Sequence, residues 1–496
     1  MIRKKGIALL LTTGVVVSCL VGCAAHGGNT SSTDVNKTEP DTENISALPT
    51  EEKEDMPSPN GVIIPPSEED EGELPTADIE AGEGNTDESA AESETPEKPP
   101  VDESTATEDA EEVEVKPVIN KDFNFNTAME SAVKRAAGDE NYIFSPLSLK
   151  AALALAEVGA KGETKAQILS VLGFETEEAL FSWYNSVVKV GNNFYAAKER
   201  VHSLAAREAE YNPSAAGAGD DMDFRIVNGV WSNETKLGRF RDSYVSDVSE
   251  KFKATADSVP AQDLTQAVND WARNTTNGLI PSIADDLSEV SAILANALYL
   301  RTAWQNTFDD YNTFEDSFTT KNGSTVTKEF MHQQDKFALY EKSDSDKLLV
   351  MPLEGGMSFV AVLGDVGDVQ TAMENATRRP VKVKMPKLDI DSTITSKTII
   401  DFLKKAGMND AFSRGVADFS AMAMDSRWYV GDIIQKARIK TDEQGLEAAA
   451  VTAVMMTTTA LAEPEREAEF FADRAFQFYI FADETGELLF AGGVQK

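Results

Sequence analysis

The acidic segment from residue 24 to residue 118 divides this chain into a part that can fold and a part that cannot. It holds 28 aspartates and glutamates against four lysines, 11 of the 19 prolines, and no aromatic residue. Such a segment cannot bury enough apolar surface to offset the entropy that ordering would cost. We therefore expect residues 23–118 to form a disordered linker and residues 119–496, which hold every aromatic residue, to form the folded body.

The net charge and the small numbers of cysteine and histidine argue against several functions. The net charge of −38 argues against a general nucleic-acid-binding protein, which needs a basic surface to displace counterions. The two cysteines form no CxxC pair, so neither a disulfide framework nor a structural zinc site is expected. Three histidines leave few candidates for a catalytic base. We expect no metal and no cofactor.

The N-terminal residues predict export. Arg3-Lys4-Lys5 precede an apolar run from Ile7 to Val21, which is typical of a secretory signal and short for a membrane span. The run ends in Leu20-Val21-Gly22-Cys23, which resembles the lipobox of bacterial lipoproteins. The resemblance implies removal of residues 1–22, lipid attachment to Cys23, and anchoring at the extracellular face of a bacterial cell envelope. The alternative is a plain secretory signal with an incidental cysteine.

The acidic linker suits the role of a tether. A flexible chain of about 95 residues spans roughly 50–60 Å, and repulsion between its carboxylates extends it further. We prefer this interpretation to an acidic binding function.

One motif suggests an enzyme. Ser131-Ala132-Val133-Lys134 matches the SxxK of penicillin-binding proteins and class A β-lactamases, but the companion SDN and KTG motifs are absent. Thr127–Ala137 also has the periodicity of an amphipathic helix, which explains the match structurally. Gly159–Thr164 lacks the GK[ST] of a phosphate-binding loop and predicts a helix end and turn.

The body resembles one known family over many separate segments. Asn141–Leu149 (NYIFSPLSL), followed by an alanine- and leucine-rich helix, resembles the opening of a serpin. Further segments match in the same order up to the C-terminus: Val268–Trp271 with Thr276-Asn277-Gly278, Leu294–Leu300 with Trp304, Met385–Leu388, Leu403–Phe412, Phe476–Ile480 and Leu489–Gly492. The resemblance implies an α+β serpin fold with three β-sheets, about nine helices and an exposed reactive-centre loop. It makes Trp304 the breach tryptophan of that fold.

A second resemblance concerns mechanism. Ten consecutive residues are similar to the hinge of an inhibitory serpin's reactive loop: Glu443, Gln444, Gly445, Leu446, Glu447, Ala448, Ala449, Ala450, Val451 and Thr452. In that family a protease attacks the loop and forms an acyl-enzyme. The cut loop then inserts into the main sheet as a new strand and distorts the protease.

The hinge residues suit insertion for physical reasons. A strand that slides between two others needs small side chains and a backbone without proline, and no proline occurs from Glu443 to Glu463. We expect Gly445 to provide a flexible joint. With a period of two, one face carries no charge: Leu446, Ala448, Ala450, Thr452, Val454 and Met456. The alternative, an alanine-rich helix, conflicts with the β-branched residues in the segment.

Two positions depart from the family pattern. Leu446 stands where inhibitory serpins usually carry threonine or serine, and its bulk could slow insertion. Gln435 occupies the place of the shutter histidine. The amide both donates and accepts hydrogen bonds, so we expect Ser145, Ser148, Asn296 and Gln435 to form the equivalent network.

At the distance from the hinge glycine that is usual in inhibitory serpins, the resemblance implies a reactive bond between Thr459 and Ala460, with Met455, Met456, Thr458 and Leu461 as alternatives. No basic residue lies between Gly445 and Pro464, which argues against trypsin-like targets. Elastase-like or subtilisin-like serine proteases fit better, and a papain-like cysteine protease fits less well.

The sequence thus predicts a lipid-anchored monomer that is not an enzyme and traps an extracellular serine protease. Two rival hypotheses stay open. The chain could be a non-inhibitory serpin, cleaved as a substrate or used as a binding surface, or it could be an enzyme of the SxxK type that acts through Ser131.

Overall fold

The computed structural model describes residues 115–211, 219–278, 280–424, 427–446 and 467–496. Several predicted features lie outside these residues: the signal and Cys23, most of the acidic linker, hinge residues 447–452, and the predicted reactive bond at Thr459 and Ala460. No helix within the described ranges is long and apolar enough to cross a membrane.

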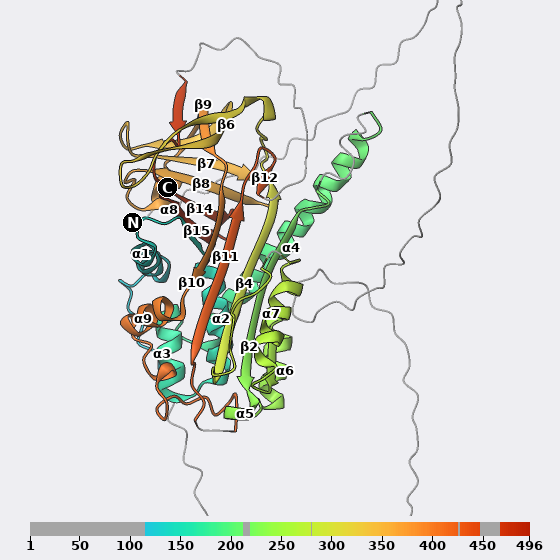
Figure 1. The fold of residues 1–496 in the computed structure, drawn as a ribbon, viewed down its shortest axis with the longest axis vertical. Coiled ribbons are helices and arrows are strands. Elements are labelled where there is room, and N and C mark those ends of the chain that lie inside the picture. Colours follow the sequence, from blue (N-terminus) through green and yellow to red (C-terminus); the bar gives the residue numbers. More distant parts are fainter. Residues whose placement is uncertain (1–114, 212–218, 279, 425–426, 447–466) are drawn as a thin grey trace, which may run out of the picture. The chain divides into compact units, whose positions relative to one another are not determined.

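Nine α-helices occur in the described part of the chain (Figure 1). Side-chain caps begin several of them: Asn124, Ser145, Thr176 and Thr395 each accept a hydrogen bond from the backbone N–H three residues ahead. The helices are α1 (Phe125–Ala137), α2 (Pro146–Gly159), α3 (Gly162–Leu172), α4 (Glu177–Glu208), α5 (Glu234–Leu237), α6 (Asp242–Phe252), α7 (Leu264–Thr275), α8 (Val369–Glu374) and α9 (Ser396–Ala406).

A six-stranded sheet joins strands that are far apart in the sequence. Its order is β10 (Asp389–Ile394), β11 (Asp432–Lys440), β4 (Ala292–Ala303), β2 (Asp223–Asn233) and β3 (Thr255–Val259), and the short β12 (Gly445–Leu446) also pairs with β4. β11 runs parallel to β4, whereas β2 and β10 run antiparallel to their neighbours β4 and β11.

The remaining strands form one nine-stranded sheet. Along its main path lie β1 (Tyr142–Phe144), β15 (Leu488–Val494), β14 (Phe476–Ala482), β8 (Met357–Leu363), β7 (Lys347–Leu353), β6 (Thr325–Glu341), β9 (Thr377–Pro386) and β13 (Ala468–Phe471), while β5 (Thr313–Thr319) pairs with β6. Of these strands, β6 is the longest at 17 residues, and it pairs with β5, β9 and β7 in turn.

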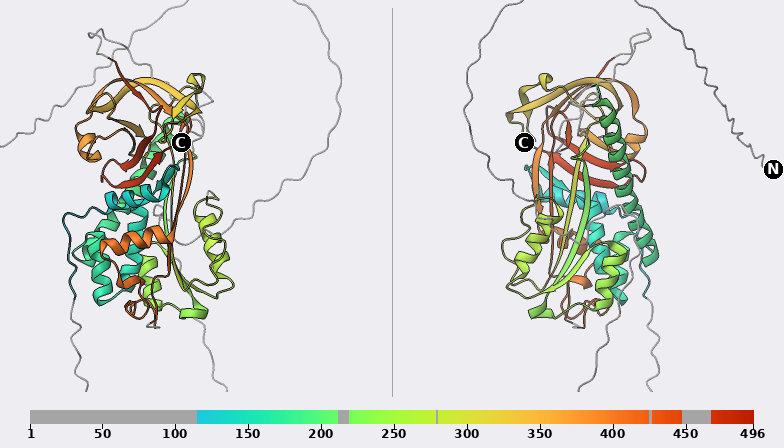
Figure 2. Two further views of the ribbon diagram at one scale, coloured as in Figure 1. Left: turned by 60° about the vertical axis from the view of Figure 1, so that its left-hand side comes forward. Right: turned by 90° about the vertical axis from the view of Figure 1, so that its right-hand side faces the viewer.

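Helices cover both faces of the six-stranded sheet (Figure 2). On one face, α7 packs through Leu264, Val268 and Ala272 onto Val227 of β2 and Ile293 of β4. On the other face lie α1, α2, α3 and α9, with an apolar core that continues to β14 and β15.

The predicted fold class is confirmed: the described residues form an α+β fold with about the expected number of helices. One detail differs from the expected three separate sheets. Because β6 continues from the β5–β9 layer into the layer formed with β7, two of those sheets are hydrogen-bonded into one. The predicted turn at Lys161 is also found, since α2 ends at Gly159 and α3 begins at Gly162.

Candidate functional site

The chain reverses direction directly after β11. The backbone N–H of Asp442 donates to the carbonyl of Gly445 at 2.9 Å, and the Asp442 carboxylate accepts the N–H groups of Gln444 and Gly445 at 2.9 and 3.1 Å. Thr441 and Leu446 form an antiparallel bridge across this turn. An aspartate that bonds to backbone groups two and three residues ahead stabilises such a turn locally. The hinge therefore starts back alongside β11.

β12 pairs antiparallel with the end of β4, with Gly445 opposite Ala303 and Leu446 opposite Thr302. A Cβ atom on Gly445 would lie 2.3 Å from the carbonyl oxygen of Thr302 and 2.5 Å from Cα of Ala303. The glycine is thus required for close backbone approach. Gly445 is not among the glycines with positive φ, and its role as a joint stays a prediction.

Contacts from the end of β4 hold the turn in place. Trp304 donates its indole N–H to the carbonyl of Asp442 and its backbone N–H to that of Gln444, both at 2.9 Å. The N–H of Phe308 donates to the carbonyl of Glu443 at 2.8 Å. Trp304, the predicted breach residue, therefore lies against the hinge.

An ion pair fixes the side of the turn that faces β9. The Glu443 carboxylate lies 2.8 Å from Nζ of Lys387, and the glutamate side chain is almost fully buried. Burial acts to raise the pKa of Glu443, but the hydrogen bonds that its carboxylate accepts, first among them the one from Lys387, and the charge of Lys387 together outweigh burial and hold that pKa below its ordinary value. The carboxylate is therefore charged at neutral pH and anchors the hinge.

Leu446 is already buried, with 1% of its surface exposed. It belongs to the core cluster that contains Leu298 and Leu300 of β4 and Ala437 and Ile439 of β11. Burying a leucine side chain stabilises a fold by about 1.5–3 kcal/mol relative to leaving it exposed. The apolar residue at this position thus holds the first turn of the hinge between the two strands.

Beyond the hinge, β11 and β4 are only partly paired. Their parallel ladder runs from Asp432 opposite Ile293 to Lys436 opposite Ala297. β11 continues to Lys440 and β4 to Ala303 without further pairs between them. The end of the sheet nearest the hinge is thus open at its centre, and β12 occupies the entrance.

The N-terminus of α2 bonds to both strands at the point where they do pair. Ser145 donates its N–H to Oε1 of Gln435 at 2.9 Å and accepts from Nε2 of the same residue at 2.8 Å. Asn296 donates to the carbonyl of Ser148 at 2.6 Å and accepts from the Ser148 hydroxyl. Gln435 and Asn296 are direct cross-strand partners, and all four residues are buried.

The structure therefore brings together the four residues predicted to form the shutter. It adds a fifth, Asn228 of β2, which lies opposite Asn296 and accepts a hydrogen bond from its amide. Asn228 was missed, although an asparagine inside the apolar run of β2 is itself a signal, because a buried amide requires partners.

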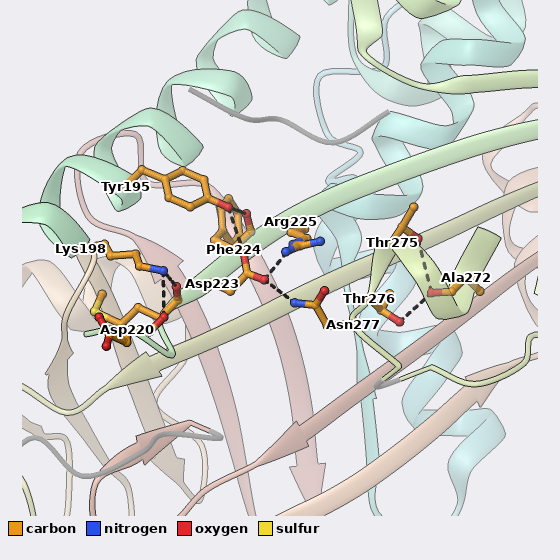
Figure 3. A network of polar contacts seen from close by, with 11 residues as sticks. Tyr195, Lys198, Asp220, Asp223, Phe224, Arg225, Ala272, Thr275, Thr276 and Asn277 are labelled. Carbon is orange, nitrogen blue, oxygen red and sulfur yellow. Dashed lines mark hydrogen bonds and ion pairs between the residues drawn. The ribbon is translucent and has the colours of Figure 1, made fainter. Parts of the chain in front are cut away.

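A polar network ties α4 and the exit of α7 to the start of β2 (Figure 3). The Asp223 carboxylate accepts from the Tyr195 hydroxyl at 3.0 Å, from Nε of Arg225 at 2.8 Å and from Nδ2 of Asn277 at 3.0 Å. Burial and the neighbouring Asp223 raise the pKa of Tyr195, so its hydroxyl stays protonated and donates. The helix that covers β2 and β4 is therefore fixed at its C-terminal end.

The residues that follow segment 447–466 are also held by the nine-stranded sheet. β13 runs parallel to β9, with Ala468 opposite Val381. The Glu467 carboxylate lies 2.8 Å from Nζ of Lys382 and accepts from the Gln334 amide at 2.5 Å. Of the residues that flank segment 447–466, Glu467 thus pairs with β9 and Glu443 pairs with Lys387, the residue directly after β9.

The structure places the SxxK motif on the surface of α1. Ser131 and Lys134 lie on the exposed side of α1, whose buried side consists of Phe125, Met129 and Val133. Among the described residues, no group of three or more histidine, cysteine, aspartate or glutamate side chains could hold a metal ion.

Comparison with known proteins agrees with this geometry. Residues 119–496 match the model of the family described as serpin (serine protease inhibitor). The chain is 30% identical to serpin-Z1B of Triticum aestivum over 74% of this chain and 92% of the relative, and 27% identical to leukocyte elastase inhibitor A of Mus musculus over 71% and 92%. The crystal structure of Serpin48 from Tenebrio molitor superposes with a TM-score of 0.58 at 25% identity, covering 75% of this chain and 96% of that one. The chain therefore belongs to the serpin family.

Proposed function

We propose that this protein inhibits serine-type endopeptidases by a single-use covalent trap. The observation that carries the proposal is the half-open six-stranded sheet, with β12 lying in the entrance between β4 and β11. The family membership supports protease inhibition in general, and this arrangement supports the trapping mechanism in particular.

The register of β12 predicts how the loop would enter. Continuing the pairing of Leu446 with Thr302 sets Ala448 opposite Leu300 and Ala450 opposite Leu298 on β4. Continuing the bridge of Leu446 with Thr441 sets the same alanines opposite Ile439 and Ala437 on β11. These partners belong to the core cluster that already holds Leu446. Alanine adds little volume there, so these positions tolerate insertion.

Further entry would require the paired half of the sheet to separate. Five ladder pairs, including Gln435 with Asn296, stand in the way. The same register brings Thr452 between these two amides. Its hydroxyl could then replace part of the hydrogen bonding that the separated amides lose. The network at the N-terminus of α2 is therefore the barrier that insertion must cross.

The chemical step belongs to the protease. Its serine oxygen would attack the carbonyl carbon of Thr459, an ester bond would form, and the amine of Ala460 would leave with a proton. Met455, Met456, Thr458 and Leu461 remain alternative positions. The apolar and small side chains favour an elastase-like or subtilisin-like enzyme, and the name of the mouse relative, leukocyte elastase inhibitor A, points to the same class.

The placement of the trap is part of the proposal. Lipid on Cys23 would hold a monomeric inhibitor at the extracellular face of a bacterial cell envelope, and residues 24–118 would carry the folded body away from the membrane. Radiolabelled fatty acid incorporated into the wild-type chain, and not into Cys23→Ser, would support the anchor.

A denaturing gel of the full chain with an elastase-type or subtilisin-type protease tests the trap. We expect a boiling-stable band near the summed masses, and mass spectrometry of the released peptide identifies the cut. Ala448→Arg puts a charge on the face of the loop that would enter the core, and should convert the inhibitor into a substrate. Glu447→Gln lies on the opposite face of the loop, and this variant should still give the boiling-stable band. Cleavage of the wild-type chain without any band would instead support the non-inhibitory alternative.

A further inference from the structure

A groove separates the outer faces of α1 and α9, which lie next to each other (Figure 1). The two helices touch through the rings of Phe125 and Phe402, whose centroids are 5.2 Å apart in an edge-to-face contact. The groove has a volume of about 460 Å³, which is within the range of ligand sites. Its walls are apolar: Phe123, Ala128, Ala132, Ala136, Phe402 and Ala406. We refer to it as the α1–α9 groove.

The rim of the α1–α9 groove is basic. Arg135 and Lys405 lie on it and are exposed, and among the described residues neither has a hydrogen-bond or ion-pair partner. The two helices together hold five basic residues and two acidic ones. This surface is therefore positive in a chain whose net charge is −38.

The acidic residues of this region do not cancel that charge. Glu130 of α1 faces β14, where the hydroxyl of Tyr479 donates to its carboxylate at 2.9 Å. Asp401 of α9 lies 2.5 Å from Nζ of Lys397 and is neutralised on its own helix. Asp122, which is exposed and precedes α1, removes one further positive charge. A net positive charge remains around the groove and favours an acidic occupant.

One segment of the acidic linker matches both the walls and the rim. Val62–Ile64 is the only run of three consecutive branched aliphatic residues between residues 24 and 114, and the four acidic residues Glu68–Glu71 follow closely. Aliphatic side chains suit the apolar walls, and the carboxylates suit Arg135 and Lys405. This segment, residues 62–71, belongs to the same chain and lies outside the described residues.

The covalent link makes a weak contact sufficient. The carbonyl of Val118 accepts from the hydroxyl of Ser170 in α3 at 2.5 Å, and α1 begins a few residues later at Phe125. The roughly 40 residues between Glu71 and Val115 span about 30–40 Å as a flexible chain, which exceeds the length of α1, about 20 Å. The segment then reaches an effective concentration on the order of millimolar, so a dissociation constant of about 1 mM fills half of the grooves.

We propose that residues 62–71 of this chain dock reversibly in the α1–α9 groove. Val62–Ile64 would lie on the apolar walls, and Glu68–Glu71 would lie at Arg135 and Lys405. The proposal goes beyond the proposed function and does not depend on it. Docking would close residues 72–114 into a loop, so that only the residues before 62 remain as a free tether. Because the contact is partly ionic, added salt would release the segment and lengthen the tether.

Cross-linking of the full chain with a water-soluble carbodiimide, which joins a carboxylate to an amine in contact with it, tests the docking. Mass spectrometry of the peptides identifies each pair. We expect cross-links from Glu68–Glu71 to Lys405 to exceed those to Lys336, an exposed lysine of β6, by about fivefold or more. Salt at about 0.5 M should reduce this ratio to less than about twofold.

A variant of the linker tests the apolar part of the contact and keeps every cross-linking group. Replacing Val62, Ile63 and Ile64 together by serine should lower the yield at Lys405 to that at Lys336. The matched control replaces three aliphatic residues elsewhere in the linker and should keep the wild-type yield: Leu74→Ser, Ile79→Ser and Val101→Ser.

A variant of the groove tests the ionic part. Arg135→Gln should lower the yield at Lys405 about threefold or more, and Arg135→Lys should restore most of it. The control is Arg414→Gln, at an exposed arginine that has no ion-pair partner in the described part of the chain, and it should leave the yield unchanged.

Three results would overturn the proposal. Equal yields at Lys405 and Lys336 in the wild-type chain would show that the linker has no preferred site. An unchanged yield after the serine substitutions at 62–64 would mean that charge alone attracts the linker. Cross-links that join isotope-labelled to unlabelled chains would make the occupant the linker of a second copy. If instead vesicles of anionic phospholipid, and not the linker, protected Lys405 from acylation, the groove would bind a membrane and the proposal would be wrong.

Discussion

At the scale of single residues, Leu446 changes the expectation drawn from the family pattern. A leucine that had to enter the sheet could slow insertion, but the structure buries this side chain before any cleavage. Burial of Leu446 then contributes to the stability of both the uncleaved form and the form with the loop inserted. We expect Leu446→Thr to lower the free energy of unfolding by about 1–3 kcal/mol while changing the number of inhibitor molecules consumed per trapped protease by less than about twofold. Denaturant unfolding and titration against protease measure both. If Leu446→Thr consumed several-fold fewer inhibitor molecules per trapped protease than wild type, the leucine would slow insertion.

Glu157 makes stability depend on pH. Its carboxyl is fully buried in α2, 3.4 Å from Nζ of Lys165. Burial raises its pKa from 4.5 to about 7, and Lys165 opposes only part of that effect. The folded state therefore retains a proton that the unfolded state releases, so stability falls as pH rises from about 4.5 to 7 and remains lower above.

Glu157→Gln removes this titration. We expect the variant to gain stability relative to wild type at pH 8 and much less at pH 5, with a wild-type slope of up to about 1.4 kcal/mol per pH unit between 5 and 7. Urea unfolding at pH 5 and pH 8 measures the difference in unfolding free energy between variant and wild type. Glu374→Gln, at an exposed position of α8, is the control. An equal effect at both pH values would contradict the assignment.

At the scale of elements, the N-terminus of α2 acts as a clamp across β11 and β4. Gln435→Leu leaves the N–H of Ser145 without its partner in a buried site, which costs about 1–3 kcal/mol, while the Ser145 carbonyl keeps its bond from the N–H of Leu149. We expect faster hydrogen exchange at the backbone amides of β4 and β11 in particular. Gln167→Leu removes the acceptor for Asn409 and Asp410 far from these strands and should leave their exchange unchanged. Uniformly faster exchange in both variants would mean only a general loss of stability.

The elements that the sequence predicts are those with local signals. The amphipathic pattern of Thr127–Ala137 corresponds to α1, and the apolar run Leu294–Leu300 lies within β4. β12 could not be predicted, because it depends on Thr302 and Trp304, which lie more than 130 residues earlier in the chain. For the same reason, the close approach that requires glycine at 445 could not be predicted. The turn at Asp442, in contrast, has a local signal in an aspartate three residues before a glycine.

At the scale of the whole molecule, the proposed trap requires the uncleaved form, with its half-open six-stranded sheet, to be less stable than a form with the loop inserted. Entry of residues 447–456 would add about ten ladder hydrogen bonds at about 1 kcal/mol each, which raises the unfolding midpoint by roughly 10 °C or more. We expect this rise when the loop of the full chain is cut by a protease that is then removed.

Ala450→Pro provides the control, since proline lacks the N–H and cannot lie in a central strand. The variant should be cut as readily as wild type, because residue 450 lies nine residues before the predicted reactive bond. Its unfolding midpoint should stay near the uncleaved value. If cleaved wild type and cleaved Ala450→Pro unfolded at the same temperature, the loop would not enter the sheet. The half-open sheet would then be a static feature of a binding protein.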